Sequence, residues 1–241
     1  MSGHSKWATI KRAKGAADAK RGKIFSTIGK EITMAARAGG GDPNANARLR
    51  TVLLKAREAN MPNDNVERAI KKGTGELEGQ AIEQMTYEGY APAGAGLIVE
   101  VTTDNKNRGA SEVRSVFTRY AGNLAQSGAV SFQFNHCGQF LIGKDKATED
   151  QLMELALDAG ADDVRVSDEG FEIICPVQSF YTLAGVLEKA GIKAESSEIV
   201  YLPKIPLVVG AEDAAKIQTL IDALEELEDV QNVFSNHEVA S

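Results

Sequence analysis

The chain has 241 residues, of which 43% are hydrophobic and 25% are charged, a composition typical of folded domains with hydrophobic cores. This length allows two or three compact domains. The composition excludes a wholly disordered or collagen-like chain, and no run of about 18 apolar residues predicts a transmembrane helix. Residues 1–12 lead into no apolar stretch of the kind found in secretory signals. With only two cysteines as well, we expect a cytoplasmic protein.

The charges are strongly polarised along the chain. Residues 1–72 contain 16 Lys and Arg against six Asp and Glu, a net charge of +10. The remaining residues contain 11 basic and 28 acidic side chains, a net charge of −17, which the total of −7 conceals. The basic segment is suited to bind a polyanion, whereas the acidic remainder is suited to water or to a basic partner.

Apolar residues at helical spacing predict three helices in the first 79 residues. The first helix includes residues 24–32 and ends at a run of three glycines. The second includes 49–56 and must end shortly afterwards, because Pro62 disfavours helical geometry in the residue before it. We expect Asn63 to cap a third helix that ends near Gly73. Short connections between the three helices indicate a small bundle.

After residue 80 the pattern changes to strands and helices. We expect strands at 86–90, 97–103 and 130–134, with a helix around 113–120 before the last of them. The glycine-rich segment 91–96 lacks the Gly-Lys-Ser/Thr ending of a phosphate loop and leads into a strand. We therefore interpret it as a hairpin loop and not as a nucleotide site.

Residues 139–201 read in order as β-α-β-β-α-β, the ferredoxin-like unit. A strand at 205–209, an acidic helix at 212–227 and a strand at 230–235 would complete the sheet begun near residue 86. The fold class is therefore α+β, with an N-terminal three-helix bundle followed by two α+β domains, the ferredoxin-like one inserted into the other. The domains are expected at 1–79, at 80–135 plus 204–241, and at 136–203.

The basic N-terminal region is the strongest candidate binding site. Lys and Arg neutralise phosphates and an indole stacks on bases, so the mixture suits DNA or RNA. The alternative is a solvated tail whose Trp anchors it to the bundle. The candidate nucleic-acid-binding residues are Lys6, Trp7, Lys11, Arg12, Lys14, Lys20, Arg21, Lys23, Arg48, Arg50, Arg57, Arg68, Lys71 and Lys72.

Other segments offer weaker signals. Lys106 and Arg108 lie between a predicted strand and a predicted helix, where backbone N–H groups favour anions, and they are a candidate secondary phosphate contact. A polar loop with a helix cap explains the same residues. His4, His136 and His237 are too scattered in the sequence to suggest a metal site, and no nucleophile or zinc-hydrolase motif occurs. We therefore expect no catalytic site, metal, cofactor, small-molecule substrate or membrane contact.

Five segments resemble the YebC/PmpR family. They run in the family's order through the first 135 residues, and the chain length fits the whole family chain. The segments are Gly-His-Ser-Lys-Trp (3–7), Met-Pro-Asn-Asp-Asn-Val-Glu-Arg-Ala-Ile-Lys-Lys-Gly (61–73), Tyr-Glu-Gly-Tyr-Ala-Pro (87–92), Thr-Asp-Asn-Lys-Asn-Arg (103–108) and Gly-Ala-Val-Ser-Phe (128–132).

The resemblance implies a cytoplasmic, non-enzymatic protein of three domains, a helical bundle and two α+β domains set one into the other. Members of the family are described as probable transcriptional regulators that bind promoter DNA. A mitochondrial relative activates translation of a respiratory-chain subunit, and bacterial members have been linked to relief of ribosomes stalled at proline-rich stretches.

Three hypotheses follow. The first is a regulator of gene expression that binds DNA through the basic N-terminal domain. The second is a translation factor that binds RNA of the large ribosomal subunit, favoured because nothing marks a recognition helix and a basic arm with a Trp suits an RNA cleft. In either case the acidic domains are expected to orient the basic domain or to meet basic ribosomal or polymerase proteins. The third, a metabolite-binding or enzymatic α+β protein, rests on fold analogy alone.

Overall fold

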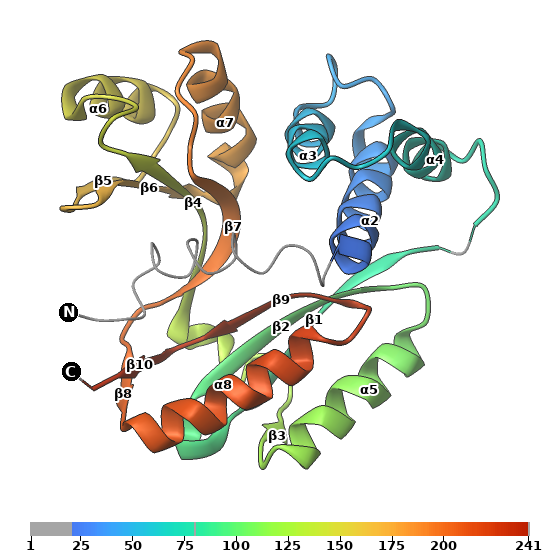
Figure 1. The fold of residues 1–241 in the computed structure, drawn as a ribbon, viewed down its shortest axis with the longest axis vertical. Coiled ribbons are helices and arrows are strands. Elements are labelled where there is room, and N and C mark those ends of the chain that lie inside the picture. Colours follow the sequence, from blue (N-terminus) through green and yellow to red (C-terminus); the bar gives the residue numbers. More distant parts are fainter. Residues whose placement is uncertain (1–20, 80, 241) are drawn as a thin grey trace.

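The computed structural model describes residues 21–79 and 81–240 and shows three groups of secondary structure. In Figure 1 a helical bundle lies beside a ferredoxin-like domain, and both lie above a second α+β domain. The predicted α+β class, with an N-terminal helical bundle followed by domains that contain sheets, is confirmed. No helix of the described part of the chain is both long and apolar enough to cross a membrane.

The bundle forms because three amphipathic helices share one apolar core. Asn46 holds the turn between the first two: its side-chain oxygen accepts from Leu49 N at 3.0 Å, and its amide donates to the Ala35 and Gly40 carbonyls at 2.8 Å each. The helices are α2 (Arg21–Gly39), α3 (Ala47–Glu58) and α4 (Asn63–Thr74). Their buried core includes Ile28, Ile32, Leu49, Val52 and Met61.

The prediction that Asn63 caps α4 is wrong. The N-cap is Pro62, with φ −58° and ψ 137°, and no side chain accepts a hydrogen bond there. Proline already holds the extended geometry that precedes a helix, so Asn63 becomes the first helical residue. The helix also continues through Gly73 and ends at Gly75, whose φ of 82° is the left-handed conformation that glycine adopts readily.

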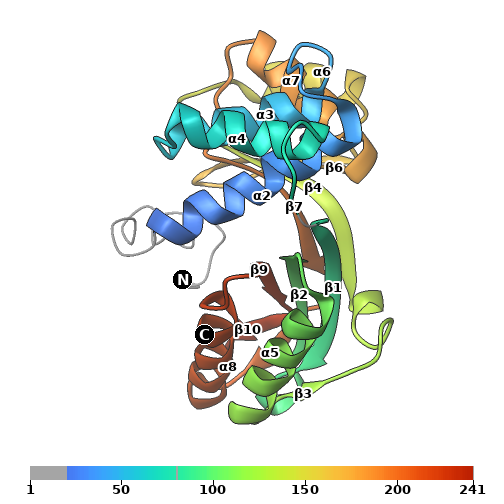
Figure 2. The same cartoon turned by 90° about the vertical axis from the view of Figure 1, so that its right-hand side faces the viewer.

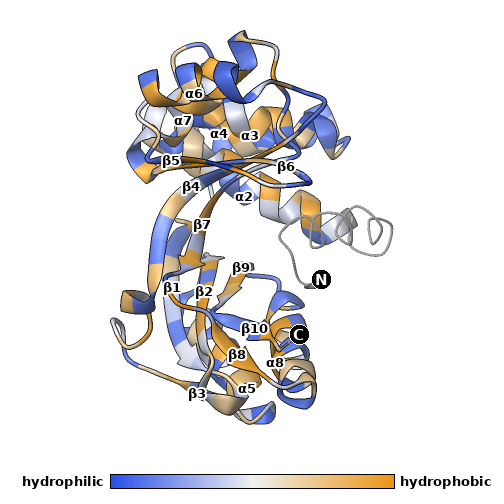
Figure 3. Cartoon of the chain, turned by 90° about the vertical axis from the view of Figure 1, so that its left-hand side faces the viewer, coloured by the Kyte–Doolittle hydropathy of each residue, from blue (hydrophilic) through white to orange (hydrophobic). Residues whose placement is uncertain are grey.

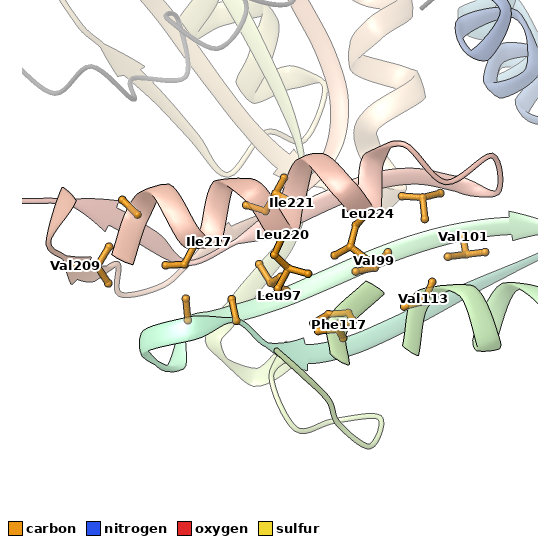
Figure 4. Close-up of a cluster of buried hydrophobic side chains, with 14 residues drawn as sticks. Leu97, Val99, Val101, Val113, Phe117, Val209, Ile217, Leu220, Ile221 and Leu224 are labelled. Atoms are coloured by element: carbon orange, nitrogen blue, oxygen red, sulfur yellow. The ribbon is translucent and has the colours of Figure 1, made fainter. Parts of the chain in front are cut away.

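The second α+β domain has an antiparallel sheet covered on one face by two helices. The strands in spatial order are β3 (Asn123–Leu124), β1 (Glu83–Tyr90), β2 (Gly96–Thr103) and β9 (Val230–Ser235), and the helices are α5 (Lys106–Arg119) and α8 (Ala211–Glu225). Figure 4 shows the core between them, which includes Leu97, Val99, Val101, Val113, Phe117, Ile217, Leu220 and Leu224. The opposite face of this sheet is therefore left to face the rest of the molecule.

The segment predicted as a strand at 205–209 does not join this sheet. Instead β8 (Leu207–Val209) pairs in parallel with β10 (His237–Val239) in a separate two-stranded sheet. The cause is Asn236, the residue between β9 and β10. Its side chain accepts from Gly96 N at 2.8 Å and donates to Gln133 Oε1 at 2.7 Å, which ends β9 and directs the following residues towards β8.

The ferredoxin-like domain has the strand order β5-β6-β4-β7 with every neighbouring pair antiparallel. Its elements are β4 (Phe134–Gly143), α6 (Glu149–Asp158), β5 (Asp163–Val166), β6 (Gly170–Pro176), α7 (Phe180–Lys189) and β7 (Ser196–Pro203). Buried strands such as β2 are coloured mostly hydrophobic in Figure 3. In Figure 2, β4 and β7 run side by side from this domain down to the second α+β domain, which places one domain within the other.

The predicted strand at 130–134 is wrong as well, because Ser131–Gln133 form a 3-10 turn and β4 begins only at Phe134. The cause is the carboxylate of Glu88, which is 5% exposed. It accepts hydrogen bonds from the N–H groups of Gly128, Val130 and Ser131 at 2.8, 2.6 and 2.8 Å, so these groups cannot pair in a strand ladder. Burial alone would raise the pKa of Glu88, but these hydrogen bonds hold its pKa below the usual value.

We expect Glu88→Gln to lower the free energy of unfolding by about 1–3 kcal/mol, because the new amide nitrogen would face backbone N–H groups. The folded-state pKa of Glu88 is lowered, so its stabilisation is present above the unfolded pKa of about 4.3 and is lost as the pH falls through the folded pKa. Urea unfolding at neutral and acidic pH measures both effects. Equal stability of the two proteins at neutral pH would contradict this role.

Candidate nucleic-acid interface

The part of the predicted interface that precedes α2 lies outside the described residues. This applies to Lys6, Trp7, Lys11, Arg12, Lys14 and Lys20, whose contact with nucleic acid stays a prediction. Arg21 is the first residue of α2. The other predicted residues of the bundle lie on α2, α3 and α4, and they differ in exposure and in hydrogen-bond partners.

Three predicted residues lie together on the outer face of α4. The inner face is formed by Ala69 and Gly73, which pack closely on α2: Thr33 Oγ1 donates to the Ala69 carbonyl at 3.1 Å, and a Cβ on Gly73 would lie 2.5 Å from the Thr33 carbonyl. This close approach fixes which side of α4 faces solvent. The exposed basic side chains of α4 are Arg68, Lys71 and Lys72.

These three cations form no ion pair with any described residue. Arg68 lies three and four residues before Lys71 and Lys72, a spacing that brings side chains close on a helix surface. Both lysines also lie in the last turn of α4, where the helix dipole favours positive charge. The dipole explains why basic residues are favourable at this end of the helix. Because both lysine side chains are exposed, an anion can still reach their ammonium groups.

The three arginines predicted on α3 lie in different surroundings. Arg57 is exposed in the last turn of the helix. Arg50 is half-buried, donates to the Pro43 carbonyl at 3.0 Å and lies 3.8 Å from the carboxylate of Glu188 in α7. Arg48 is also half-buried and lines a cavity between the domains. Of the three, only Arg57 is fully presented to solvent.

The lysines of α2 contact the second α+β domain. Lys23, predicted to bind phosphate, donates through Nζ to the Leu227 carbonyl at 2.8 Å. Lys30, two turns later, donates to the Glu228 carbonyl at 3.2 Å and to Asp229 Oδ1 at 2.8 Å. These lysines therefore attach α2 to the turn between α8 and β9.

Asp229 is the centre of this attachment. The residue is 4% exposed, and its carboxylate accepts hydrogen bonds from Lys30 at 2.8 Å, Thr103 Oγ1 at 2.7 Å and Arg108 at 2.7 Å. Burial would raise the pKa of Asp229, but its three donors hold that pKa below the ordinary value. The sequence did not indicate the pairing of Lys30 with Asp229, since no local pattern joins positions 199 residues apart.

Lys106 and Arg108, the predicted secondary phosphate contact, are both paired with carboxylates. Lys106 Nζ lies 2.7 Å from Glu83, and Arg108 contacts Asp104 at 2.8 Å in addition to the buried carboxylate described above. The side chain of Asn105 accepts from Arg108 N at 3.1 Å and caps α5. The segment is thus a polar loop with a helix cap, and a phosphate would have to compete with these carboxylates.

The described residues contain no group of three or more His, Cys, Asp or Glu side chains arranged to hold a metal ion. Cys137 and Cys175 are buried and do not form a disulfide. Burial raises the pKa of the Cys137 thiol and raises the pKa of Cys175 to about 11. Both thiols are therefore protonated at neutral pH, and neither is activated as a nucleophile.

The family model described as "TACO1/YebC protein N-terminal domain" matches residues 5–76, and the one described as "TACO1/YebC second and third domain" matches residues 82–237. The chain belongs to the TACO1/YebC family. The first match includes the three helices of the bundle, and the second includes the two α+β domains.

Relatives match the chain along nearly its whole length. A "Probable transcriptional regulatory protein" of Opitutus terrae is 58% identical over 240 residues, covering 99% of this chain and 97% of the relative. One of the same name from Treponema pallidum is 52% identical over 241 residues, covering 100% and 98%. A solved structure of a conserved hypothetical protein from Aquifex aeolicus has a TM-score of 0.82 and 44% identity, covering 94% of each chain. The family membership expected from the sequence motifs is confirmed.

We expect Asp229→Asn to lower the free energy of unfolding by about 1.5–3 kcal/mol, because the buried pair with Lys30 and the hydrogen bond from Thr103 lose the carboxylate charge. The folded-state pKa of Asp229 is lowered, so this stabilisation is present above the unfolded pKa of about 3.9 and disappears as the pH falls through the folded pKa. Thermal unfolding as a function of pH measures it.

The matched control is Asp104→Asn, which removes the exposed carboxylate partner of Arg108 and leaves Asp229 intact. Its effect on unfolding should be small, as is usual for exposed ion pairs. If both variants lost the same stability, the buried position of Asp229 would not matter and the assignment would be wrong.

Proposed function

We propose that this protein is a regulator of gene expression that binds DNA through its N-terminal domain. The relatives named above are called probable transcriptional regulatory proteins, and membership of their family supports the same role here. The observation that carries the proposal is a set of exposed cations without ion pairs to described residues. We call them the bundle cations: Arg57, Arg68, Lys71 and Lys72.

The bundle cations differ in their surroundings from the cations that face the acidic domains. Lys23, Lys30 and Arg108 are already held by carbonyl or carboxylate oxygens. The bundle cations have no such partner among the described residues. A nucleic acid would gain free energy by releasing counterions when these cations neutralise its phosphates. The proposed protein acts in the cytoplasm and is not an enzyme. It needs no cofactor, no membrane and no small-molecule substrate.

The described helices favour contact with the nucleic-acid backbone over reading of bases in a groove. A recognition helix presents its N-terminal residues to the major groove. The first turns of α4 carry Asp64 and Glu67, both exposed, and phosphates on either side of a groove would repel them. Arg68 lies in the middle of the helix, and Lys71 and Lys72 lie in its last turn, so we assign these cations to phosphate contacts that position the protein.

This arrangement also favours a second candidate, a translation factor that binds RNA of the large ribosomal subunit and relieves stalling at proline-rich stretches. Structured RNA is recognised largely by shape and by backbone contacts, which need no recognition helix. In this case the acidic α+β domains would meet basic ribosomal proteins. In the DNA-binding case they would meet basic surfaces of the polymerase.

We expect the double variant Lys71→Gln/Lys72→Gln to bind duplex DNA more weakly, by a similar factor for every sequence. Two lost phosphate contacts should make the slope of log affinity against log salt shallower by about 1.8 on duplex DNA. Fluorescence anisotropy at several salt concentrations measures this change. The matched control is Lys144→Gln/Lys204→Gln, which removes two exposed lysines outside the bundle. Equal salt slopes for the two double variants would refute the assignment.

Sedimentation with ribosomes through a sucrose cushion, with excess random duplex DNA present, separates the two candidates. Pelleting with ribosomes that the Lys71→Gln/Lys72→Gln variant loses supports the translation factor. Retention on DNA, with a promoter fragment preferred over random duplex, supports the transcriptional regulator. A protein that binds neither partner contradicts both.

A further inference from the structure

Three exposed apolar side chains gather at one corner of the second α+β domain. Ile205 is 81% exposed, Phe132 65% and Val208 64%, the highest values among the large hydrophobic side chains of the described residues. The backbone N–H of Lys204 donates to the Gln133 carbonyl at 2.9 Å. Phe132 and Ile205 directly adjoin these two residues in the chain and therefore lie close together, and Val208 follows three residues later in β8. Exposed apolar residues that gather in this way mark interaction surfaces.

The same corner contains an open sheet edge. One side of β8 pairs with β10, and its other side pairs with no described strand. In Figure 1 these two strands lie at the left margin of the second α+β domain. Two hydrogen bonds at the ends of the pair fix which backbone groups face β10: Leu207 N donates to the Asn236 carbonyl at 2.7 Å, and Ala240 N donates to the Val209 carbonyl at 2.9 Å.

The backbone groups that point away from β10 follow from these two bonds. A trans peptide directs its C=O and its N–H to opposite sides, and the described residues contain no cis peptide bond. Because Leu207 N points to β10, the Pro206 carbonyl points to the open edge. Because the Val209 carbonyl points to β10, the N–H of Gly210 points to the open edge, and alternation along the strand places both backbone groups of Val208 there as well. None of these groups has a hydrogen-bond partner among the described residues.

We propose that this edge pairs with the same edge of a second copy of the chain, with the two β8 strands antiparallel and Val208 opposite Val208 across a two-fold axis. The two Val208 residues would then exchange two N–H···O=C hydrogen bonds. Each Gly210 N–H would donate to the Pro206 carbonyl of the other copy. Because every contact occurs twice, the pairing closes on itself as a dimer and leaves no free edge for a third copy.

The two ends of the edge are complementary in this register. Pro206 has no N–H to donate, and it would lie opposite Gly210, whose carbonyl already accepts from Ala214 N at 2.9 Å. The missing donor therefore faces an acceptor that is already occupied, and no backbone group of the edge from 206 to 210 stays unpaired. Proline ordinarily protects an edge strand from unspecific pairing. Here it disfavours every register in which the other strand would need a donor from residue 206.

Side chains and charges favour the same arrangement. Leu207 and Val209 pack against the core of the second α+β domain, and Leu207 of one copy would lie opposite Val209 of the other, so the two cores would meet. The two exposed Val208 side chains would bury each other on the opposite face of the strands. Exposed Lys204 precedes the strand and exposed Glu212 follows it, so antiparallel pairing places opposite charges at each end of the contact.

The test measures the oligomeric state of the full chain by analytical ultracentrifugation. A short edge gives a weak contact, so the protein is examined at concentrations up to about 1 mM. The wild type should show a monomer–dimer equilibrium. Val208→Asp places two carboxylates opposite each other and should raise the dimer Kd by about tenfold or more. Because Val208 is exposed in the monomer, the melting temperature in dilute solution should not fall.

The matched control is Val166→Asp, the same substitution at an exposed valine of another edge strand, β5. It should keep the Kd of the wild type. Cross-linking then tests the register: Val208→Cys brings two thiols together at the two-fold axis, so a short bis-maleimide should join two copies, whereas Val166→Cys should stay unlinked. The native thiols of Cys137 and Cys175 are buried and should not react.

Each outcome decides the proposal. A dimer that only Val208→Asp weakens, and that is cross-linked only through Val208→Cys, supports it. A wild-type protein that stays monomeric over the whole range overturns it and leaves the edge to a strand of a different protein. A dimer that Val208→Asp weakens no more than Val166→Asp also overturns it, because the two copies would then meet at another surface. Neither contrary result touches the proposed function, since these measurements contain no nucleic acid.

Discussion

The position of the bundle against the second α+β domain depends on one buried carboxylate, that of Asp229. A buried charge is unfavourable unless it is paired and hydrogen-bonded. Asp229 is matched by Lys30 from α2, Thr103 from the end of β2 and Arg108 from α5. Because these donors come from different parts of the chain, the charge is satisfied only when the bundle lies against the second α+β domain. The same contact holds α2 over the polar face of the sheet and so defines the cavity beneath it.

Much of the fold could be predicted because its signals are local. Helical spacing of apolar residues located the three helices, and the order of strands and helices identified the ferredoxin-like unit. The turn at 130–134 could not be predicted, since it depends on a carboxylate 42 residues away that captures its N–H groups. The ion pair between Lys30 and Asp229 could not be predicted for the same reason, because 199 residues separate the two positions. Sequence patterns report on neighbours along the chain, whereas these features are set by neighbours in space.

The cations of the basic segment fall into two groups, which the sequence alone does not separate: some contact the acidic domains and others face away from them. Lys23, Lys30 and Arg50 face the acidic domains, where oxygens of the α8–β9 turn or of α7 bind them. Arg68, Lys71 and Lys72 face away, because close packing of Ala69 and Gly73 on α2 turns them outward. The net charge of +10 therefore overstates the charge available to a polyanion. The acidic domains neutralise cations on one side of the bundle, whereas Arg68, Lys71 and Lys72 on the other side form no ion pair with a described residue.

The most informative contrast in the molecule is between satisfied and unsatisfied buried polar groups. Glu88 and Asp229 each accept three hydrogen bonds, so this fold is able to match even a buried charge. The side-chain amide of Gln231, at a bulge in β9, has no hydrogen-bond partner among the described residues. The fold therefore satisfies its buried charges, which are most unfavourable when unpaired, more fully than this neutral amide.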